Sequence, residues 1–351
     1  MRSFPKIDKL HFSVQFNLEI KLHRLVYFRN MKSLYFEKYG SSDVLSVRDI
    51  PKPTLEPGRV MIRVHAVSIN PLDWRLMKAE PFLARFAFGL LKPKLNGLGA
   101  DFSGVVESVA SDVSDFSIGD AVFGIMTPEI VGALSEYISI PATGLVKKPD
   151  NLTHVAASTL GVAALTAYEG IHDYRRPTVG DTVLINGASG GIGTFAVQMA
   201  KALGAHVTAV CSGKNHEMVK RLGADVLIDY KTADFLQTTE RFDLVYDTIG
   251  NHPPKHIKHL LKEDGRLVLA SAADGFGFLK ALRAAKKDPA IDMIVELKKD
   301  TPRLKAVLQL VEDGITPVID RTYPLNEAAS AIDYVATKRA RGKVVVTLGK
   351  T

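Results

Sequence analysis

The chain has 351 residues, of which 46% are hydrophobic and 24% charged, with one cysteine and a formal net charge of +7 at pH 7. This length and apolar content suffice for two folded domains and exclude a largely disordered chain. A single cysteine excludes an internal disulfide framework and a multi-cysteine zinc site, so a reducing, intracellular setting is expected. No run of about twenty apolar residues occurs, so we expect no membrane-spanning helix.

The positive charge is concentrated at the N-terminus, where residues 1–30 contain six Lys/Arg and two Asp/Glu. The charge that remains elsewhere is ordinary and gives no reason to expect a nucleic-acid partner. Residues 1–30 lack the apolar core and cleavage site of a secretory signal. Two interpretations stay open: a transit peptide, or a misassigned start with Met31 as the initiator. The expected location is the cytoplasm, with organellar import if residues 1–30 are a transit peptide.

The part of the chain that follows Met31 is rich in β-strand patterns. Strands are expected over residues 32–36, 45–49 and 60–67, separated by turns rich in Gly, Ser and Pro. Further short strands are expected between residues 105 and 124. These patterns predict a compact barrel of short strands.

A strand, a glycine turn, a helix and a second strand follow one another between Asp181 and Ser212. Residues 182–186 form a short β-branched apolar run, which is typical of a buried parallel strand. The segment 194–203 has helical composition and spacing, and a glycine ends it. Residues 206–211 supply the second strand. This order predicts a dinucleotide-binding unit.

The turn of this unit reads GASGGIG, with glycines spaced three apart. Glycine permits a tight turn and lets the backbone approach a pyrophosphate at the positive end of a helix. The alternative is a tight structural turn that binds no nucleotide. The residues predicted to hold the dinucleotide here are Gly187, Ser189, Gly190, Gly191, Ile192 and Gly193.

The end of the second strand indicates which nicotinamide cofactor is used. An acidic residue there would bind the 2′-hydroxyl of NAD, but the chain continues with Cys211, Ser212, Gly213 and Lys214. A hydroxyl and a cation suit a 2′-phosphate, which predicts NADP(H) as the cofactor. The alternative is that Lys214 is an ordinary surface lysine.

Strands and helices continue to alternate beyond this unit. Residues 151–174 read as a helical connection of small residues, and 244–246 and 267–269 resemble buried parallel strands. The segment 272–294 is open to two interpretations, a helix near the mouth of the active site or an irregular surface excursion.

Seven short motifs, in their order and spacing, resemble a known family. They are KYGSSDVL at Lys38, SINPLD at Ser68, GADFSGVV at Gly99, GDAVFG at Gly119, TAYEG at Thr166, GASGGIG at Gly187 and RGKVVV at Arg341. The chain resembles zinc-independent members of the medium-chain dehydrogenase/reductase superfamily, close to the quinone oxidoreductase and enone reductase branch.

The resemblance implies an α/β fold of two domains. Residues 31–150 would form a GroES-like β-barrel catalytic domain, completed by residues 316–351. Residues 151–315 would form a Rossmann domain, a doubly wound parallel sheet that binds NADP. The resemblance also implies a homodimer.

The resemblance implies chemistry without a metal. Zinc-dependent relatives have a Cys ligand where Asn70 stands and a His–Glu pair where Ala100 and Asp101 stand, so we expect no metal site. What remains is hydride transfer from the reduced nicotinamide to a small electrophile, either a quinone or an α,β-unsaturated carbonyl.

Two residues are the candidates for catalysis. The amide of Asn70 could donate to a substrate oxygen or to the nicotinamide; alternatively, an Asn before Pro fixes a turn. Thr166 resembles the family residue that lies against the nicotinamide. Tyr230 matches the position that contacts the adenosine phosphate end. Arg75 stands where many relatives have Tyr, which weakens the case for a quinone but not for reduction.

Two functions are therefore compatible with the sequence. The first is an NADPH-dependent oxidoreductase. The alternative is a nucleotide-binding structural or regulatory protein that keeps the reductase fold with little turnover, because a fold alone does not decide function.

Overall fold

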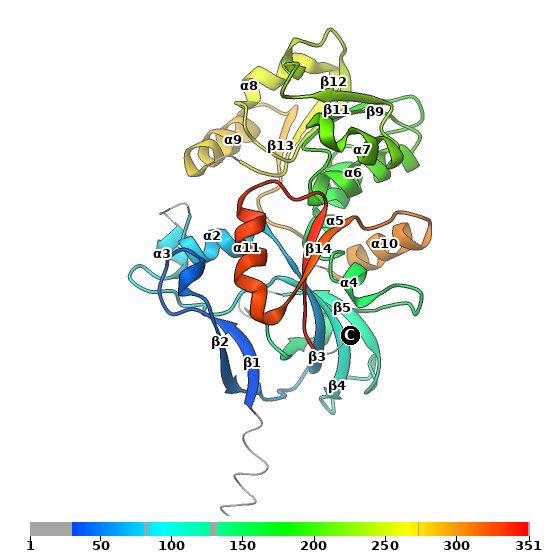
Figure 1. Ribbon diagram of the computed structural model, residues 1–351. Helices are drawn as coiled ribbons and strands as arrows, with labels where there is room; N and C mark the ends of the chain where they lie inside the picture. Colours follow the sequence, from blue (N-terminus) through cyan, green and yellow to red (C-terminus); the bar gives the residue numbers. More distant parts are fainter. Residues whose placement is uncertain are drawn as a thin grey trace, which may run out of the picture.

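The computed structural model describes residues 30–80, 82, 84–126, 132–272, 274–298 and 300–349. Two sheet-based units are stacked one above the other, and the two ends of the described chain lie in the lower unit (Figure 1). No helix within the described ranges is long and apolar enough to cross a membrane. The two interpretations of the N-terminal extension, residues 1–30, lie outside these ranges except for Asn30, which begins a strand.

The lower unit is built on a seven-stranded sheet with the order β14-β15-β3-β4-β5-β7, and β6 pairs with β3. Its strands are β3 (Arg59–Ile69), β4 (Asp101–Val109), β5 (Ala121–Ile125), β6 (Tyr137–Pro141), β7 (Leu145–Lys147), β14 (Ile319–Pro324) and β15 (Lys343–Thr347). The tail of the chain returns to this unit, because β15 runs antiparallel to β3. The strands β1 (Asn30–Tyr35) and β2 (Ser46–Pro51) form a separate two-stranded sheet beside it.

The upper unit contains a six-stranded sheet in which every pairing is parallel. Its order is β10-β9-β8-β11-β12-β13, which is the strand order of a Rossmann fold. The strands are β8 (Thr182–Asn186), β9 (His206–Cys211), β10 (Val226–Asp229), β11 (Phe242–Asp247), β12 (Leu261–Leu269) and β13 (Ile291–Met293). The predicted fold class, a barrel domain with a doubly wound parallel sheet, is confirmed. The exact domain boundaries stay a prediction.

The longer helices are α2 (Pro71–Lys78), α5 (Val162–Tyr168), α6 (Gly191–Ala202), α9 (Gly275–Lys287), α10 (Thr301–Glu312) and α11 (Ala328–Ala336). The shorter ones include α3 (Ala84–Phe88), α4 (His154–Ala157), α7 (His216–Arg221) and α8 (Pro254–Ile257). The segment 272–294, for which the sequence left two interpretations, thus contains the helix α9 followed by the strand β13. Helix α6 begins earlier than predicted, at Gly191, because the glycine turn itself adopts the first helical turn.

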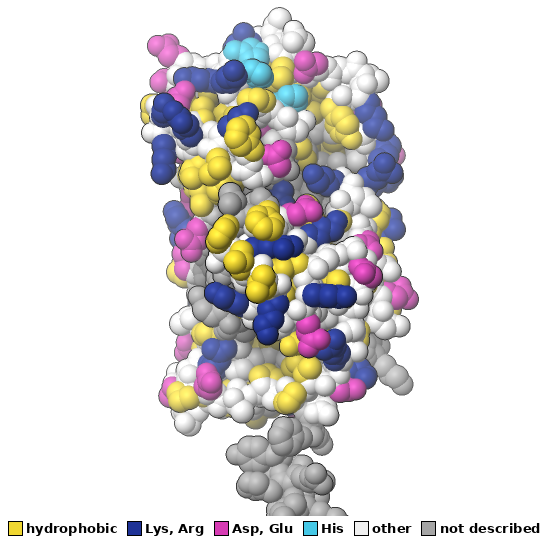
Figure 2. Space-filling model, turned by 90° about the vertical axis from the view of Figure 1, so that its left-hand side faces the viewer, with side chains coloured by type: hydrophobic (Ala, Val, Ile, Leu, Met, Phe, Trp, Pro, Cys, Tyr) yellow, Lys and Arg dark blue, Asp and Glu magenta, His cyan; other side chains and the backbone are white. Residues whose placement is uncertain are grey.

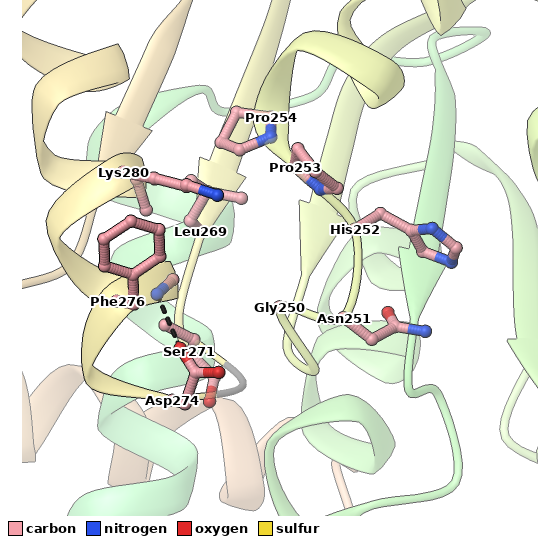
Figure 3. A pocket seen from close by; sticks show the side chains of 13 residues that line it. Gly250, Asn251, His252, Pro253, Pro254, Leu269, Ser271, Asp274, Phe276 and Lys280 are labelled. Carbon is pink, nitrogen blue, oxygen red and sulfur yellow. Dashed lines mark hydrogen bonds between the residues drawn. The ribbon is translucent and has the colours of Figure 1, made fainter. Parts of the chain in front are cut away.

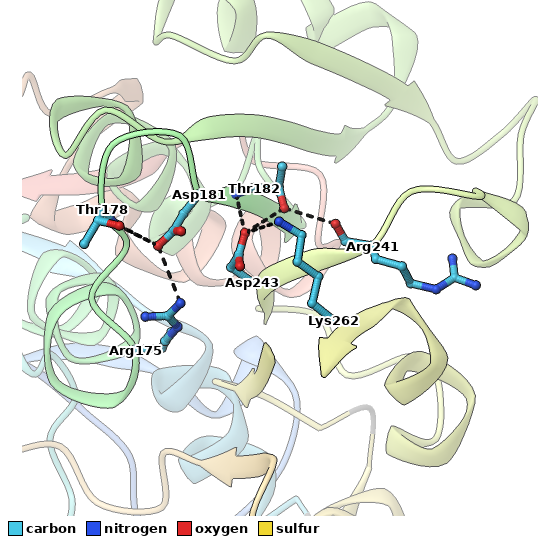
Figure 4. A network of polar contacts seen from close by, with 7 residues as sticks. All are labelled: Arg175, Thr178, Asp181, Thr182, Arg241, Asp243 and Lys262. Carbon is cyan, nitrogen blue, oxygen red and sulfur yellow. Dashed lines mark hydrogen bonds and ion pairs between the residues drawn. The ribbon is translucent and has the colours of Figure 1, made fainter. Parts of the chain in front are cut away.

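The amino and carboxyl ends of the parallel strands differ in what they carry: polar pairs at the amino ends and a cavity at the carboxyl ends. At the amino ends of β8 and β11, Asp243 accepts hydrogen bonds from the Thr182 backbone at 2.8 Å and from the Lys262 ammonium at 2.7 Å (Figure 4). Such pairing ties the strand starts together. The carboxyl ends of the strands face the lower unit and carry the cavity described below. Ligands of doubly wound sheets bind at these carboxyl ends.

Candidate functional site

The glycine turn between β8 and α6 is packed too closely for a side chain at Gly187 and Gly193. Gly187 has φ +87°, and a Cβ there would lie 2.4 Å from Thr248 Oγ1. A Cβ at Gly193 would lie 2.2 Å from the Gly187 carbonyl oxygen. Both positions therefore require glycine. The first N–H groups of α6 are left free of side-chain caps, as an anion site at a helix start requires.

A cavity of about 1010 Å³ opens beside this turn. Its lining includes six of the residues predicted to bind the cofactor: Gly187, Ser189, Gly190, Ser212, Lys214 and Tyr230. The other three, Gly191, Ile192 and Gly193, form the first turn of α6. The fold thus brings the two predicted groups, the glycine turn and the residues for the 2′-phosphate, to one cavity.

The cavity also has basic residues that the sequence did not identify. Lys231 follows Tyr230, whereas Lys338 and Arg339 come from the segment between α11 and β15. The Gly342 N–H donates to the Ser189 carbonyl at 2.9 Å, which holds this segment against the glycine turn. The side of the cavity that faces the lower unit therefore adds positive charge.

One buried amide on the cavity wall lacks part of its hydrogen bonding. Asn215 Nδ2 donates to Ser189 Oγ at 2.9 Å, but its Oδ1 is buried and has no partner among the described residues. A buried carbonyl oxygen without a donor is unfavourable. A bound ligand that carries a donor would satisfy it. This orphaned atom and the glycine cradle both fit a dinucleotide.

A buried polar network joins the start of α2 to β4 and β15. Its members are Asn70, Asp73, Asp101 and Lys343, each at most 3% exposed. Asn70 Oδ1 accepts from the Lys343 ammonium at 2.6 Å, and Asn70 Nδ2 donates to Asp101 and to the Ser68 carbonyl. Asp73 accepts from the backbone of Asn70 and Gly99, both at 2.7 Å. The amide of Asn70 thus bridges a carboxylate and an ammonium, and both of its hydrogens are engaged.

Burial dominates the electrostatics of this network. It raises the pKa of Asp73 to about 6 and also raises the pKa of Asp101, while the Lys343 ammonium opposes both shifts. Burial lowers the pKa of Lys343, which the two carboxylates oppose. The three charges therefore depend on one another to remain ionised without water.

Asp101 also connects this network to the helix that carries Thr166. Its Oδ2 accepts from the Val162 N–H at the start of α5 at 3.0 Å. The Thr166 hydroxyl donates to the Val162 carbonyl at 2.6 Å, and its side chain is mostly buried. The hydroxyl oxygen keeps acceptor capacity. Helix α5 packs against α6, so Thr166 and the glycine turn belong to one packed layer.

Comparison with known proteins assigns the family. The description "Alcohol dehydrogenase GroES-like domain" matches residues 56–150, and "Zinc-binding dehydrogenase" matches residues 222–346. The mitochondrial NAD(P)H oxidoreductase RTN4IP1 of Bos taurus is 34% identical, over 91% of this chain and 89% of that protein. The chain belongs to the medium-chain dehydrogenase/reductase superfamily.

Other relatives narrow the branch of this superfamily. The chloroplastic NADPH-dependent alkenal/one oxidoreductase of Arabidopsis thaliana is 31% identical, over 91% of this chain and 80% of that protein. The solved structure of the quinone oxidoreductase from Coxiella burnetii is 30% identical with a TM-score of 0.82, covering 92% of this chain and all of that one. The predicted branch, quinone oxidoreductases and enone reductases, is confirmed. The protein is an oxidoreductase that uses a nicotinamide cofactor.

One family description names zinc, but the residues of this oxidoreductase are poor metal ligands. Among the described residues, no three His, Cys, Asp or Glu side chains are grouped as metal ligands. Asn70 Oδ1 instead accepts from the Lys343 ammonium, whose charge also acts on Asp101. A metal cation beside a buried ammonium would be repelled. These residues do not fit a catalytic zinc.

Two neighbours of Asn70 reach different parts of the oxidoreductase. Trp74 is buried in the core of the lower unit, so the structure places it in packing, with its Nε1 unpartnered among the described residues. Arg75 Nη2 donates to the Ala272 carbonyl of the upper unit at 3.1 Å, and this hydrogen bond links the two units. Partial burial lowers the pKa of Arg75. The departure from Tyr thus places a cation between the two units.

Proposed function

We propose that this oxidoreductase uses NADPH to transfer hydride, without a metal, to a quinone or an α,β-unsaturated carbonyl. The observation that carries the proposal is the composition of the large cavity. Ser212, Lys214 and Tyr230 line it beside the glycine turn, together with the cations of Lys338 and Arg339. Charge-assisted hydrogen bonds of this kind suit a 2′-phosphate. Asp229, the nearby acid at the end of β10, is not among the lining residues, and its carboxylate accepts the Lys231 N–H at 2.9 Å.

Each part of the site has a proposed role. The N–H groups at the start of α6 bind the pyrophosphate, and the remaining glycines give it room. Thr166, whose hydroxyl keeps acceptor capacity, would hold the nicotinamide end of the cofactor. The bound cofactor supplies the hydride, and the protein supplies orientation and exclusion of water.

For Asn70 the geometry supports positioning over direct contact with the substrate. Its two amide hydrogens are donated within the protein and its oxygen is bound by Lys343, so it has no free donor for a substrate oxygen. We propose that Asn70, the single residue between β3 and α2, fixes this junction in place through its contacts with Lys343 and Asp101. A donor other than Asn70 would then have to polarise the acceptor.

A panel of quinones and enals with NADPH and NADH tests this function, with the loss of nicotinamide absorbance as the readout. We expect turnover with NADPH and much weaker turnover with NADH. NADPH binding without turnover across the panel would favour the structural or regulatory alternative. Faster turnover with NADH would reject the cofactor assignment.

Assembly and location are also proposals. The homodimer rests on resemblance, and light scattering at several concentrations tests it. Named relatives are mitochondrial or chloroplastic, which supports import into an organelle through residues 1–30. Fractionation of cells that express the full chain or a chain starting at Met31 separates import from a misassigned start.

A further inference from the structure

The exposed apolar side chains of this protein are concentrated in two segments, residues 82–94 around α3 and residues 275–287 of α9. These segments hold seven of the fourteen large hydrophobic side chains that are exposed among the described residues, including all four exposed phenylalanines. The seven are Phe82, Phe86, Leu90, Leu91, Phe276, Phe278 and Leu279. Single exposed apolar residues are ordinary on a protein surface, but such a concentration marks an interaction site.

The charges in the same two segments have a single sign. They contain seven Lys/Arg and no Asp/Glu: Arg85, Lys92, Lys94, Lys280, Arg283, Lys286 and Lys287. The acids that flank α9 are engaged, since Asp274 caps the helix through the Gly277 N–H at 2.6 Å and Asp288 pairs with Lys258. Within the described ranges, none of these seven cations forms an ion pair with a carboxylate.

Apolar and basic side chains are interleaved on this face. On α9, Phe276, Leu279, Lys280, Arg283, Lys286 and Lys287 are all exposed and recur at helical spacing, so they form one stripe. The Lys280 ammonium lies 4.5 Å from the centre of the Phe276 ring, and the Arg85 guanidinium lies 5.0 Å from that of Phe82. Figure 2, which views the side where α3 and α9 lie in Figure 1, shows hydrophobic side chains interspersed with Lys and Arg.

The two segments lie on the same side of the molecule, α3 in the lower unit and α9 in the upper unit (Figure 1). The hydrogen bond from Arg75 to the Ala272 carbonyl joins α2, which precedes α3, to the residues just before α9. A small cavity of about 160 Å³ opens next to α9, with Phe276 and Lys280 on one side and the loop Gly250–Pro254 on the other (Figure 3). Asn251 and His252 line both this small cavity and the large one, so whatever binds the basic and apolar face is held near the site.

We propose that this face, residues 82–94 and 275–287, docks on an anionic lipid bilayer. A basic stripe with exposed Phe and Leu is the composition of a helix that lies in the interface of a membrane, where cations contact anionic headgroups and apolar side chains enter the acyl boundary. Docking would place the small cavity beside α9 next to the bilayer, so that a lipophilic acceptor could pass from the membrane toward the site; this last step rests on the proposed function.

Charge argues against two other occupants of the face. A second copy docked symmetrically would oppose like charges, because the same seven cations would meet themselves. The N-terminal extension has six Lys/Arg and two Asp/Glu among residues 1–30, so it is basic too. An anionic surface is the occupant that complements the face.

Flotation of the full-length protein with vesicles tests the proposal, without cofactor or acceptor, so the result does not depend on the enzymatic activity. Vesicles of phosphatidylcholine alone are compared with vesicles that contain about one third phosphatidylglycerol, at low and high salt. We expect binding to the anionic vesicles only, weakened by salt. Absence of binding at low salt would overturn the proposal.

Two double variants separate the charged from the apolar contribution. Arg283→Glu with Lys286→Glu should lower the partition coefficient at least about thirty-fold, since each basic residue near an anionic surface contributes a factor of about five. Phe276→Ser with Leu279→Ser should lower it about ten-fold or more and leave the salt dependence in place. The matched controls, Lys220→Glu and Val179→Ser, alter exposed residues of the upper unit outside the face and should bind as the parent does.

Three outcomes would contradict the proposal. Unchanged binding of both double variants would assign the membrane contact to another segment, such as residues 1–29. A loss of vesicle binding in Lys220→Glu as large as that in the charge-reversed double variant would show that only net charge matters. A change of oligomeric state in either double variant, measured by light scattering without lipid, would show that the face binds a second copy. Turnover of a water-soluble acceptor, unchanged in the variants, confirms that they are folded.

Discussion

The Lys343 ammonium lies 2.6 Å from Asn70 Oδ1, and this contact joins the last strand of the chain to the loop that follows β3. The lysine side chain runs past the glycine turn, since a Cβ at Gly191 would lie 2.9 Å from Lys343 Cδ. The same residue therefore touches the proposed pyrophosphate cradle and neutralises part of the charge of the buried carboxylates. The junction of the two units depends on it.

Replacement of Lys343 by Met should destabilise the protein by about 3–5 kcal/mol, because it leaves Asp101 and Asp73 buried without their cation. Urea unfolding at neutral pH measures this. We also expect weaker NADPH binding. Lys343 directly follows Gly342, whose N–H holds the tail of the chain against Ser189 of the glycine turn.

Lys305→Met is the matched control, because Lys305 is exposed on α10. It should change the free energy of unfolding by less than about 0.5 kcal/mol. A Lys343→Met protein as stable as the control would mean that the two carboxyl groups are protonated in the native state and need no cation.

Asn70→Ala should lower the melting temperature and turnover together. The variant removes the bridge between Lys343 and Asp101, so a cost of about 1–3 kcal/mol in the free energy of unfolding is expected for the groups left unsatisfied. NADPH affinity should change much less than turnover if the junction between β3 and α2 is displaced and the cofactor site is not.

A different result would restore the role of Asn70 as a donor to the substrate. Normal stability combined with a loss of turnover equivalent to about 2.7–4 kcal/mol in the barrier is the signature of a lost donor to developing charge. Thermal unfolding and steady-state kinetics on the same preparation distinguish the two.

The cofactor-binding unit could be predicted from the sequence because its signals are local. The strand over residues 182–186, the glycine turn and the following helix occupy one continuous segment, and each has a characteristic residue pattern. Ser212 and Lys214 follow directly from the end of the next strand. The order of the motifs then indicated the family and the return of the tail to the barrel.

The remaining features of the site could not be predicted because they arise from packing between distant segments. Lys343 reads as a surface residue in RGKVVV, yet β15 pairs with β3 and buries it beside Asn70. Arg339 reaches the cavity only because the Gly342 segment contacts the glycine turn. The Asn70 amide likewise donates to Asp101 and is not free for a substrate, and no local sequence pattern reveals this hydrogen bond.

Lys214→Ala should reduce NADPH affinity by about 1.5–3 kcal/mol, the range for a hydrogen bond to a charged group. NADH affinity should barely change, because NADH lacks the 2′-phosphate. Titration of the nicotinamide fluorescence measures both. Lys220→Ala, on the exposed surface of α7 and outside the cavity, is the control and should leave both affinities unchanged. Equal losses for the two cofactors would show that Lys214 does not contact the phosphate.

Activity should survive chelators, and the purified protein should contain no stoichiometric zinc. The reason is the ammonium of Lys343, which binds Asn70 and acts on Asp101, so that a metal cation there would be repelled. Elemental analysis and turnover after dialysis against a chelator measure this. One zinc per chain, lost together with activity, would contradict the proposed mechanism.

The raised pKa of Asp73 predicts a specific dependence of stability on pH. Burial, with a smaller contribution from the charge of Asp101, raises this pKa to about 6, whereas an unfolded chain has a pKa near 4. The native state therefore holds an extra proton between these values. The contribution of Asp73 to stability is fully present below about pH 4 and is lost as pH rises through about 6.

Asp73→Asn removes this titration, so the stability difference between the parent protein and the variant should shrink as pH rises from about 4.5 to about 7. The change should approach 2–3 kcal/mol at most, because about two pKa units correspond to roughly that free energy. Urea unfolding of both proteins at the two pH values measures it. Asp264→Asn, an exposed substitution in β12, controls for the loss of a carboxylate elsewhere. A difference that stays constant, or grows with pH, would mean that Lys343 keeps Asp73 ionised throughout this range.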